Sequence, residues 1–237
     1  MKNMMTRVLL VTAFLGAAAQ AFGVNITLPT NVGCSGGGGD VLCGVDPKMT
    51  YLLNAGPFNG STFPSDGSVN PLVIDLQTVV GLGINTGDVL RLTAMGDMCF
   101  NYSAGCQSPY FGGVFSSSAL FDTNNLVLNR VINAQSAPGG TTPGVNSLGL
   151  LTTNGGFDPN IAQDFTIFQA AGTSFVMPNI STYRYLFVGI LDNYYGDNTD
   201  PDQNLQIRLT VVPEPGTYGL FLSGLGALLA FRRFRKN

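Results

Sequence analysis

The feature that most constrains the fold of this chain is a strict alternation of apolar and polar residues near its C-terminal end. In residues 205–211, Leu, Ile, Leu and Val alternate with Gln, Arg and Thr. A period of two is typical of a β-strand with one buried face. Residues 89–93 alternate less completely, and the continuous apolar run 185–191 is typical of a strand in the core. These three runs predict β-strands.

Further short apolar runs occur along the chain, separated by clusters of Asn, Gly, Pro and Asp residues that favour turns. No stretch between the two ends keeps a helical period, and the 45% of apolar residues can fill a sizeable core. The sequence therefore predicts an all-β fold, an antiparallel β-sandwich of the jelly-roll type, in residues 22–212. The other expected strands are 72–76, 113–117, 126–132 and 165–168.

The N-terminus has the pattern of an export signal. Lys2 and Arg7 precede an apolar stretch, and the small residues Ala19 and Ala21 frame an Ala-x-Ala cleavage site. The apolar run is too short for a membrane span. We expect a signal peptide at residues 1–21, with cleavage after Gly23 as the alternative.

The four cysteines form two local pairs, which fits an oxidising compartment outside the cytoplasm. Proximity in sequence favours the disulfides Cys34–Cys43 and Cys99–Cys106, although four cysteines allow three connectivities. The alternatives are four free thiols or a zinc site built from all four cysteines. The expected export to an oxidising compartment disfavours both.

Composition excludes several function classes. The chain has no His and one Glu, so Ser-His-Asp and Cys-His catalysis and His-ligated zinc cannot occur. Residues 22–212 carry five Lys and Arg against thirteen Asp, a net charge of −8, which repels nucleic acid and favours hard cations. We therefore expect that the protein is not an enzyme. The remaining catalytic route is a pair of Asp carboxylates of the glycosidase kind, drawn from Asp88, Asp97 and Asp192.

Residues 192–202 concentrate four Asp and two Asn around Gly196, between two expected strands. Carboxylate and amide oxygens at close spacing suit calcium, which takes six to eight oxygen ligands. The same residue types also make ordinary solvated turns, so this pattern leaves both interpretations open.

The C-terminus combines three features in a fixed order. Pro213, Glu214 and Pro215 come first, followed by an apolar segment at 218–231 and a basic tail at 232–237. A helix of 14 residues is about 21 Å long, which is short against a hydrocarbon layer of roughly 30 Å. The terminal Arg and Lys side chains can snorkel, and they favour a cytoplasmic location for this end. We expect a single hydrophobic anchor helix in the inner membrane.

This arrangement resembles the PEP-CTERM sorting signal of exported bacterial proteins. The resemblance implies that Pro213, Glu214 and Pro215 are recognised by an exosortase, a membrane protease that cuts near them. It also implies that the protein then passes to the cell surface or to the extracellular polysaccharide. The alternative is a plain tail anchor that is never cut.

A second resemblance involves residues 186–198 and the strand that follows, together with residues 86–96. These segments resemble the calcium-loop hairpin and the Gly-Asp-Val strand of PA-IL-like galactose-binding bacterial lectins. The resemblance implies a calcium ion that bridges protein and sugar hydroxyls. The implied ligands are the side chains of Asp192, Asp197 and Asn198 and the main-chain oxygen of Phe100.

Together these features predict a signal peptide at 1–21, a β-sandwich at 22–212 and a sorting signal at 213–237. We expect an exported surface or matrix protein that is not an enzyme and that binds calcium and extracellular carbohydrate. A purely structural matrix protein without a ligand is the alternative.

Overall fold

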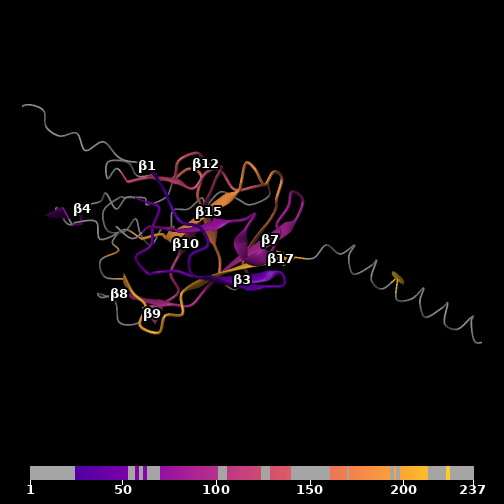
Figure 1. Cartoon of the computed structure of the whole chain (residues 1–237). Helices are drawn as coiled ribbons and strands as arrows, with labels where there is room; N and C mark the ends of the chain where they lie inside the picture. The colour runs from indigo at the N-terminus through magenta and orange to yellow at the C-terminus, as the bar shows by residue number, and fades with distance from the viewer. Residues whose placement is uncertain are drawn as a thin grey trace, which may run out of the picture.

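The computed structural model of the chain describes residues 25–52, 57–58, 61–62, 70–100, 106–123, 129–139, 161–169, 171–192, 195, 198–212 and 223–224. Among these residues, a 3₁₀ turn at Val79–Gly81 and the helical Ser223 and Gly224 are the exceptions to an all-β structure. The expected fold class is therefore confirmed (Figure 1).

The first main sheet, here the β17 sheet, has five strands that all pair antiparallel. Its central strand is the alternating segment of the sequence, and Ile207 and Leu209 point inward while Arg208 is exposed. The strands, in spatial order, are β14 (Thr173–Val176), β7 (Val89–Met95), β17 (Gln206–Val212), β3 (Asp40–Gly44) and β2 (Cys34–Gly37).

The second main sheet, here the β15 sheet, also consists of antiparallel pairs. Neighbouring strands come from distant parts of the chain, as in jelly-roll sandwiches. The order is β12 (Ala134–Gln135), β10 (Phe111–Ser116), β15 (Tyr185–Ile190) and β6 (Leu72–Asp75), and β13 (Phe165–Ile167) pairs with β10 as well.

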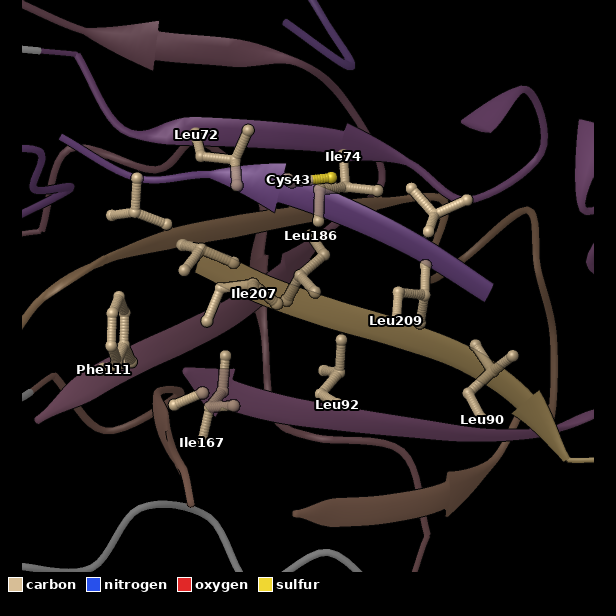
Figure 2. Packing of buried hydrophobic residues seen from close by; sticks show 14 of the residues in the cluster. Cys43, Leu72, Ile74, Leu90, Leu92, Phe111, Ile167, Leu186, Ile207 and Leu209 are labelled. Carbon is tan, nitrogen blue, oxygen red and sulfur yellow. The ribbon is translucent and has the colours of Figure 1, made fainter. Parts of the chain in front are cut away.

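The main core lies between the two sheets. Leu92 and Ile207 of the β17 sheet and Phe111 and Leu186 of the β15 sheet belong to one cluster of buried side chains. Figure 2 shows these side chains meeting between the strands of the two sheets. The core position of β15 agrees with its continuous apolar sequence.

The β15 sheet is covered on its other face too. Val73, Val114 and Phe187 point into a second buried cluster that also contains Leu28 and Phe121. The covering layer includes the strand pair β1 (Asn25–Thr27) and β11 (Leu120–Asp122). This second layer explains why every residue of β10 is buried.

Two smaller sheets complete the described strands. One contains β16 (Asn198–Thr199), β8 (Met98–Phe100) and β9 (Cys106–Gln107), and the other pairs β4 (Pro57–Phe58) with β5 (Ser61–Thr62). Both expected disulfides are present: Cys34–Cys43 joins β2 to β3, and Cys99–Cys106 joins β8 to β9.

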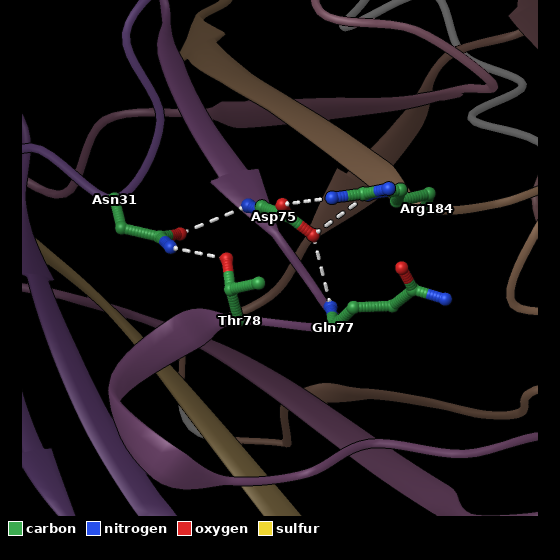
Figure 3. A network of polar contacts seen from close by, with 5 residues as sticks. All are labelled: Asn31, Asp75, Gln77, Thr78 and Arg184. Atoms are coloured by element: carbon green, nitrogen blue, oxygen red, sulfur yellow. Dashed lines mark hydrogen bonds and ion pairs between the residues drawn. The ribbon is translucent and has the colours of Figure 1, made fainter.

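A polar network fixes the end of β6, as Figure 3 shows. Asn31 accepts a hydrogen bond from the backbone N–H of Asp75 at 2.9 Å and donates one to Thr78 Oγ1 at 3.2 Å. Arg184 forms an ion pair with the Asp75 carboxylate at 2.9 Å. The network therefore joins the β1–β2 connection to both β6 and the start of β15.

The strand expected at 126–132 is wrong in its described part. Asn129 and Val131 form only isolated bridges, to Leu52 and Phe121. The two bridges go to different segments, and Arg130 between them is buried, with its guanidinium donating hydrogen bonds to the carbonyls of Thr50 and Leu52. The Val131 N–H donates to the Asn129 side chain at 3.0 Å, a local hydrogen bond that competes with strand pairing.

The signal peptide at 1–21 lies outside the described residues, and so does the sorting signal at 213–237 apart from two residues. Within the expected anchor segment 218–231, only Ser223 and Gly224 are described, and both are helical. In the described part of the chain, no helix is long and apolar enough to cross a membrane.

Candidate functional site

The strongest candidate for a ligand site is the polar junction between β15 and β16. Asp192 follows β15 and is only 5% exposed, while Tyr195 and Asn198 are completely buried. Burial of three polar side chains within seven residues is unusual, because each must lose its hydration. The junction therefore depends on specific polar contacts.

Tyr195 organises this junction. Its hydroxyl donates to the Ile190 carbonyl at 2.9 Å and accepts from Thr50 Oγ1 at 3.0 Å and from the backbone N–H of Asp192 at 3.3 Å. Burial raises the pKa of Tyr195 above its ordinary value, and the charge of Asp192 raises it further against the hydrogen bond from Thr50. The hydroxyl consequently stays protonated and holds the first residues after β15 in place.

Asn198 faces the same junction from β16. Its Nδ2 donates to the Pro47 carbonyl at 3.1 Å, and its backbone N–H donates to the Tyr195 carbonyl at 3.3 Å. Its side-chain oxygen, Oδ1, is buried and has no hydrogen-bond partner in the described structure. A buried amide oxygen in this state is free to coordinate a cation.

The structure brings together some of the expected calcium ligands. Asn198 is the direct antiparallel partner of Phe100, and Asp192 and Asn198 are both hydrogen-bonded to Tyr195. Asp197 lies outside the described residues. Among the residues that are described, no three His, Cys, Asp or Glu side chains are grouped to hold a metal ion.

The second half of the acidic loop is used differently. Asn204 Nδ2 donates to Asp97 at 3.0 Å and to Asp202 at 2.8 Å, and both carboxylate oxygens of Asp200 accept backbone N–H groups. Reduced hydration, a hydrogen bond with Asp200 and the charges of Asp97 and Asp200 raise the pKa of Asp202. These carboxylates take part in hydrogen bonds within the turn, as the alternative interpretation of the loop expects.

The sequence did not reveal the partners that build the junction. Thr50 lies 145 residues before Tyr195, and Pro47 lies 151 residues before Asn198, so these pairs come together only through the fold. The one signal available in the sequence was Tyr195 inside the acidic loop 192–202, and a Tyr there is equally typical of a core residue.

A groove of about 600 Å³ runs over the outer face of the β17 sheet, between β7 and β17. Arg91 and Arg208 line it; Arg91 donates to the Ala171 carbonyl at 2.7 Å, and Arg208 forms an ion pair with Asp40 at 2.7 Å. Val212, the last residue of β17, also lines the groove.

Comparison with known families gave one result. Residues 211–236 match the PEP-CTERM protein-sorting motif. This match supports export and sorting by an exosortase-type membrane protease, with a C-terminal membrane anchor before processing. The match includes Pro213, Glu214 and Pro215, and it begins inside β17.

Comparison with curated proteins gave no match, and neither did comparison with solved structures. The lectin resemblance gains no support from these comparisons. Calcium and carbohydrate binding therefore depend on the residues of the β15–β16 junction alone.

Proposed function

We propose that this chain is a non-catalytic surface protein, whose β-sandwich is released from its membrane anchor by an exosortase-type protease and is then displayed outside the cell. The observation that carries this proposal is the sorting motif at 211–236, directly after the sandwich. Two prolines in three residues prevent helix formation and strand pairing, so they keep the cleavage segment accessible to a protease.

The test is processing of the full chain in a bacterium that carries such a protease. We expect mature wild-type protein to lack the residues after the Pro-Glu-Pro triplet by mass spectrometry. The double variant Pro213→Ala/Pro215→Ala should keep its tail and stay in the membrane fraction. Thr217→Ala is the matched control and should be processed like the wild type. Surface protein that still carries the basic tail at 232–237 contradicts the proposal.

Absence of catalysis is part of this proposal. Two of the three Asp residues nominated for a glycosidase pair, Asp88 and Asp97, flank the seven-residue strand β7. That strand is about 23 Å long, whereas paired glycosidase carboxylates lie roughly 5–10 Å apart. The absence of catalysis is contradicted if the wild-type protein hydrolyses a polysaccharide and Asp97→Asn or Asp192→Asn loses that activity.

We further propose that the β15–β16 junction binds calcium through Asp192, Asp197, Asn198 and the main-chain oxygen of Phe100. The observation that favours this site is the Oδ1 atom of Asn198, which is buried and has no hydrogen-bond partner in the described structure. The residue Asn198 is also the antiparallel strand partner of Phe100. A calcium ion at this junction supplies the missing partner and offers free coordination positions to sugar hydroxyls.

Thermal unfolding of the mature protein in calcium and in chelator tests the metal. A ligand that binds only the folded state adds about 2.7 kcal/mol at a hundredfold excess over its dissociation constant. We expect Asp192→Asn and Asp197→Asn each to abolish this calcium-dependent gain, and Asp202→Asn, in the same loop, to keep it. A gain that persists in both of the first two variants contradicts the site.

Carbohydrate binding is tested separately. If the calcium ion bridges protein and sugar, the mature protein should be retained on an immobilised galactose polymer in calcium and released by chelator. Asp202→Asn again serves as the control. Calcium-dependent stabilisation without any retention on a broad glycan panel contradicts the carbohydrate function and leaves the metal site in place.

A further inference from the structure

Three valines form a row at one end of the β17 sheet, and the outer two of them are exposed. Val176 of β14 is paired with Val89 of β7, which is paired on its other side with Val212 of β17. Residues in register on adjacent antiparallel strands project from the same face. Val176 is 49% exposed, Val212 is 37% exposed and Val89 between them is half-buried. This row, here the valine rim, therefore presents apolar side chains to solvent.

The valine rim adjoins the sorting signal without any intervening linker. Val212 is the last residue of β17, and the next residue in the sequence is Pro213. Consecutive Cα atoms are about 3.8 Å apart. Val212 is fixed by its pairing with Val89, and the Val211 N–H donates to the Gly39 carbonyl at 2.9 Å. The Pro-Glu-Pro triplet therefore starts at a rigid part of the sandwich.

The distance to the membrane segment is also short. Only residues 213–217 separate Val212 from Tyr218, where the apolar segment begins. An extended chain spans at most about 3.5 Å per residue, so the rim cannot lie more than roughly 20 Å from that segment. A membrane protease that seats Pro213, Glu214 and Pro215 in its active site must come into contact with the end of the β17 sheet.

We propose that the valine rim is a docking surface for the sorting protease, and that it contacts an apolar patch beside the site that reads the triplet. This inference rests on the proposed sorting function. A lipid surface is the poorer occupant, because the net charge of −8 on residues 22–212 repels anionic headgroups. The rim exists only in the folded sheet, so docking selects folded sandwiches for release.

The test is the rate of processing of the full chain in cells, followed by pulse-chase. Val176→Asp places a charge on the rim and should slow processing about tenfold. Val32→Asp, at a valine that is 58% exposed in the β1–β2 connection, should be processed at the wild-type rate. Val176→Thr keeps the shape of the side chain and should slow processing less than Val176→Asp does. An unchanged thermal unfolding temperature shows that each variant is folded. If Val176→Asp does not fold, Val176→Thr and Val176→Ser carry the test.

A spacer provides the second measurement. Ten Gly and Ser residues inserted between Val212 and Pro213 uncouple the rim from the triplet, so Val176→Asp should have no further effect in that background. Folded Val176→Asp processed at the wild-type rate overturns the docking surface alone. Wild-type chain that stays unprocessed overturns the sorting function and the docking surface together. Binding of the mature protein to vesicles of phosphatidylethanolamine and anionic phosphatidylglycerol that is lost in Val176→Asp overturns the protease as the occupant.

Discussion

The guanidinium of Arg184 lies against the carboxylate of Asp75, with Nη2 at 2.9 Å from Oδ2 and Nε at 3.2 Å from Oδ1. Burial alone raises the pKa of Asp75. Hydrogen bonds from Arg184, from the Gln77 N–H and from Thr78, together with the Arg184 charge, outweigh burial and hold the pKa below its ordinary value. The charged form of Asp75 therefore stabilises the fold.

Asp75→Asn should lower the free energy of unfolding by about 1–2 kcal/mol at pH 7, because Arg184 is partly exposed and solvent weakens the pair. The folded-state pKa lies below the unfolded value of about 3.9, so this stability is present above pH 4 and is lost as the pH falls through the folded pKa. Urea unfolding at pH 7 and pH 3 should show the gap between wild type and variant closing at acid pH.

Asp40→Asn is the matched control, since Asp40 forms a more exposed pair with Arg208. We expect this change to cost less than about 1 kcal/mol. A gap between wild type and Asp75→Asn that stays constant down to pH 3 contradicts the role of the Asp75 charge.

The sequence predicted those strands whose burial produces a recognisable pattern of apolar residues. β17 alternates because only one face of its sheet is covered, and β15 is continuous because both faces are buried. The sequence concealed the β2–β3 hairpin, since its Gly-rich run reads as a loop. In the structure Gly36 and Gly37 belong to β2, and Gly38 and Gly39 form the turn with φ of 65° and 99°. Both angles are positive, a conformation that glycine adopts without steric cost.

The candidate site was predictable to a smaller extent. Asp192 and Asn198 stand out in sequence as an acidic loop, and both are buried where β15 and β16 meet. The contacts of Tyr195 with Thr50 and of Asn198 with Pro47 depend on tertiary packing, which a pattern of neighbouring residues does not encode. The same limit explains the error at 126–132, where Asn129 and Val131 each pair with a different distant segment and form only isolated bridges.

The disulfide between Cys34 and Cys43 should contribute about 2–3 kcal/mol, the value expected for closing a loop of this length. The double variant Cys34→Ser/Cys43→Ser should lose this amount in urea unfolding. Adding reductant to that variant should then cost only what the Cys99–Cys106 bridge supplies. Equal unfolding midpoints for wild type and the double variant contradict this expectation.

Tyr195→Phe removes the hydroxyl that joins Ile190, Thr50 and Asp192. It leaves three buried groups without that partner, so we expect a loss of about 1–3 kcal/mol in thermal or urea unfolding. Tyr110→Phe, at an exposed position, should change stability by less than about 0.5 kcal/mol. A Tyr195→Phe variant as stable as wild type shows that the hydroxyl does not hold the junction.

Gly189 allows the chain at Thr50 to pack directly on β15. A Cβ at this position comes within 2.8 Å of Thr50 Cα and 3.1 Å of the Met49 carbonyl oxygen, both of them backbone atoms that cannot rotate away. Gly189→Ala should therefore force the two segments apart and cost about 1–3 kcal/mol. It should also disturb the Thr50–Tyr195 contact, so any calcium-dependent stabilisation should fall with it.

Gly44→Ala, where a Cβ has no atom within 4 Å, is the control and should be nearly neutral in urea unfolding. Equal effects at the two glycines contradict the close packing of Thr50 on β15.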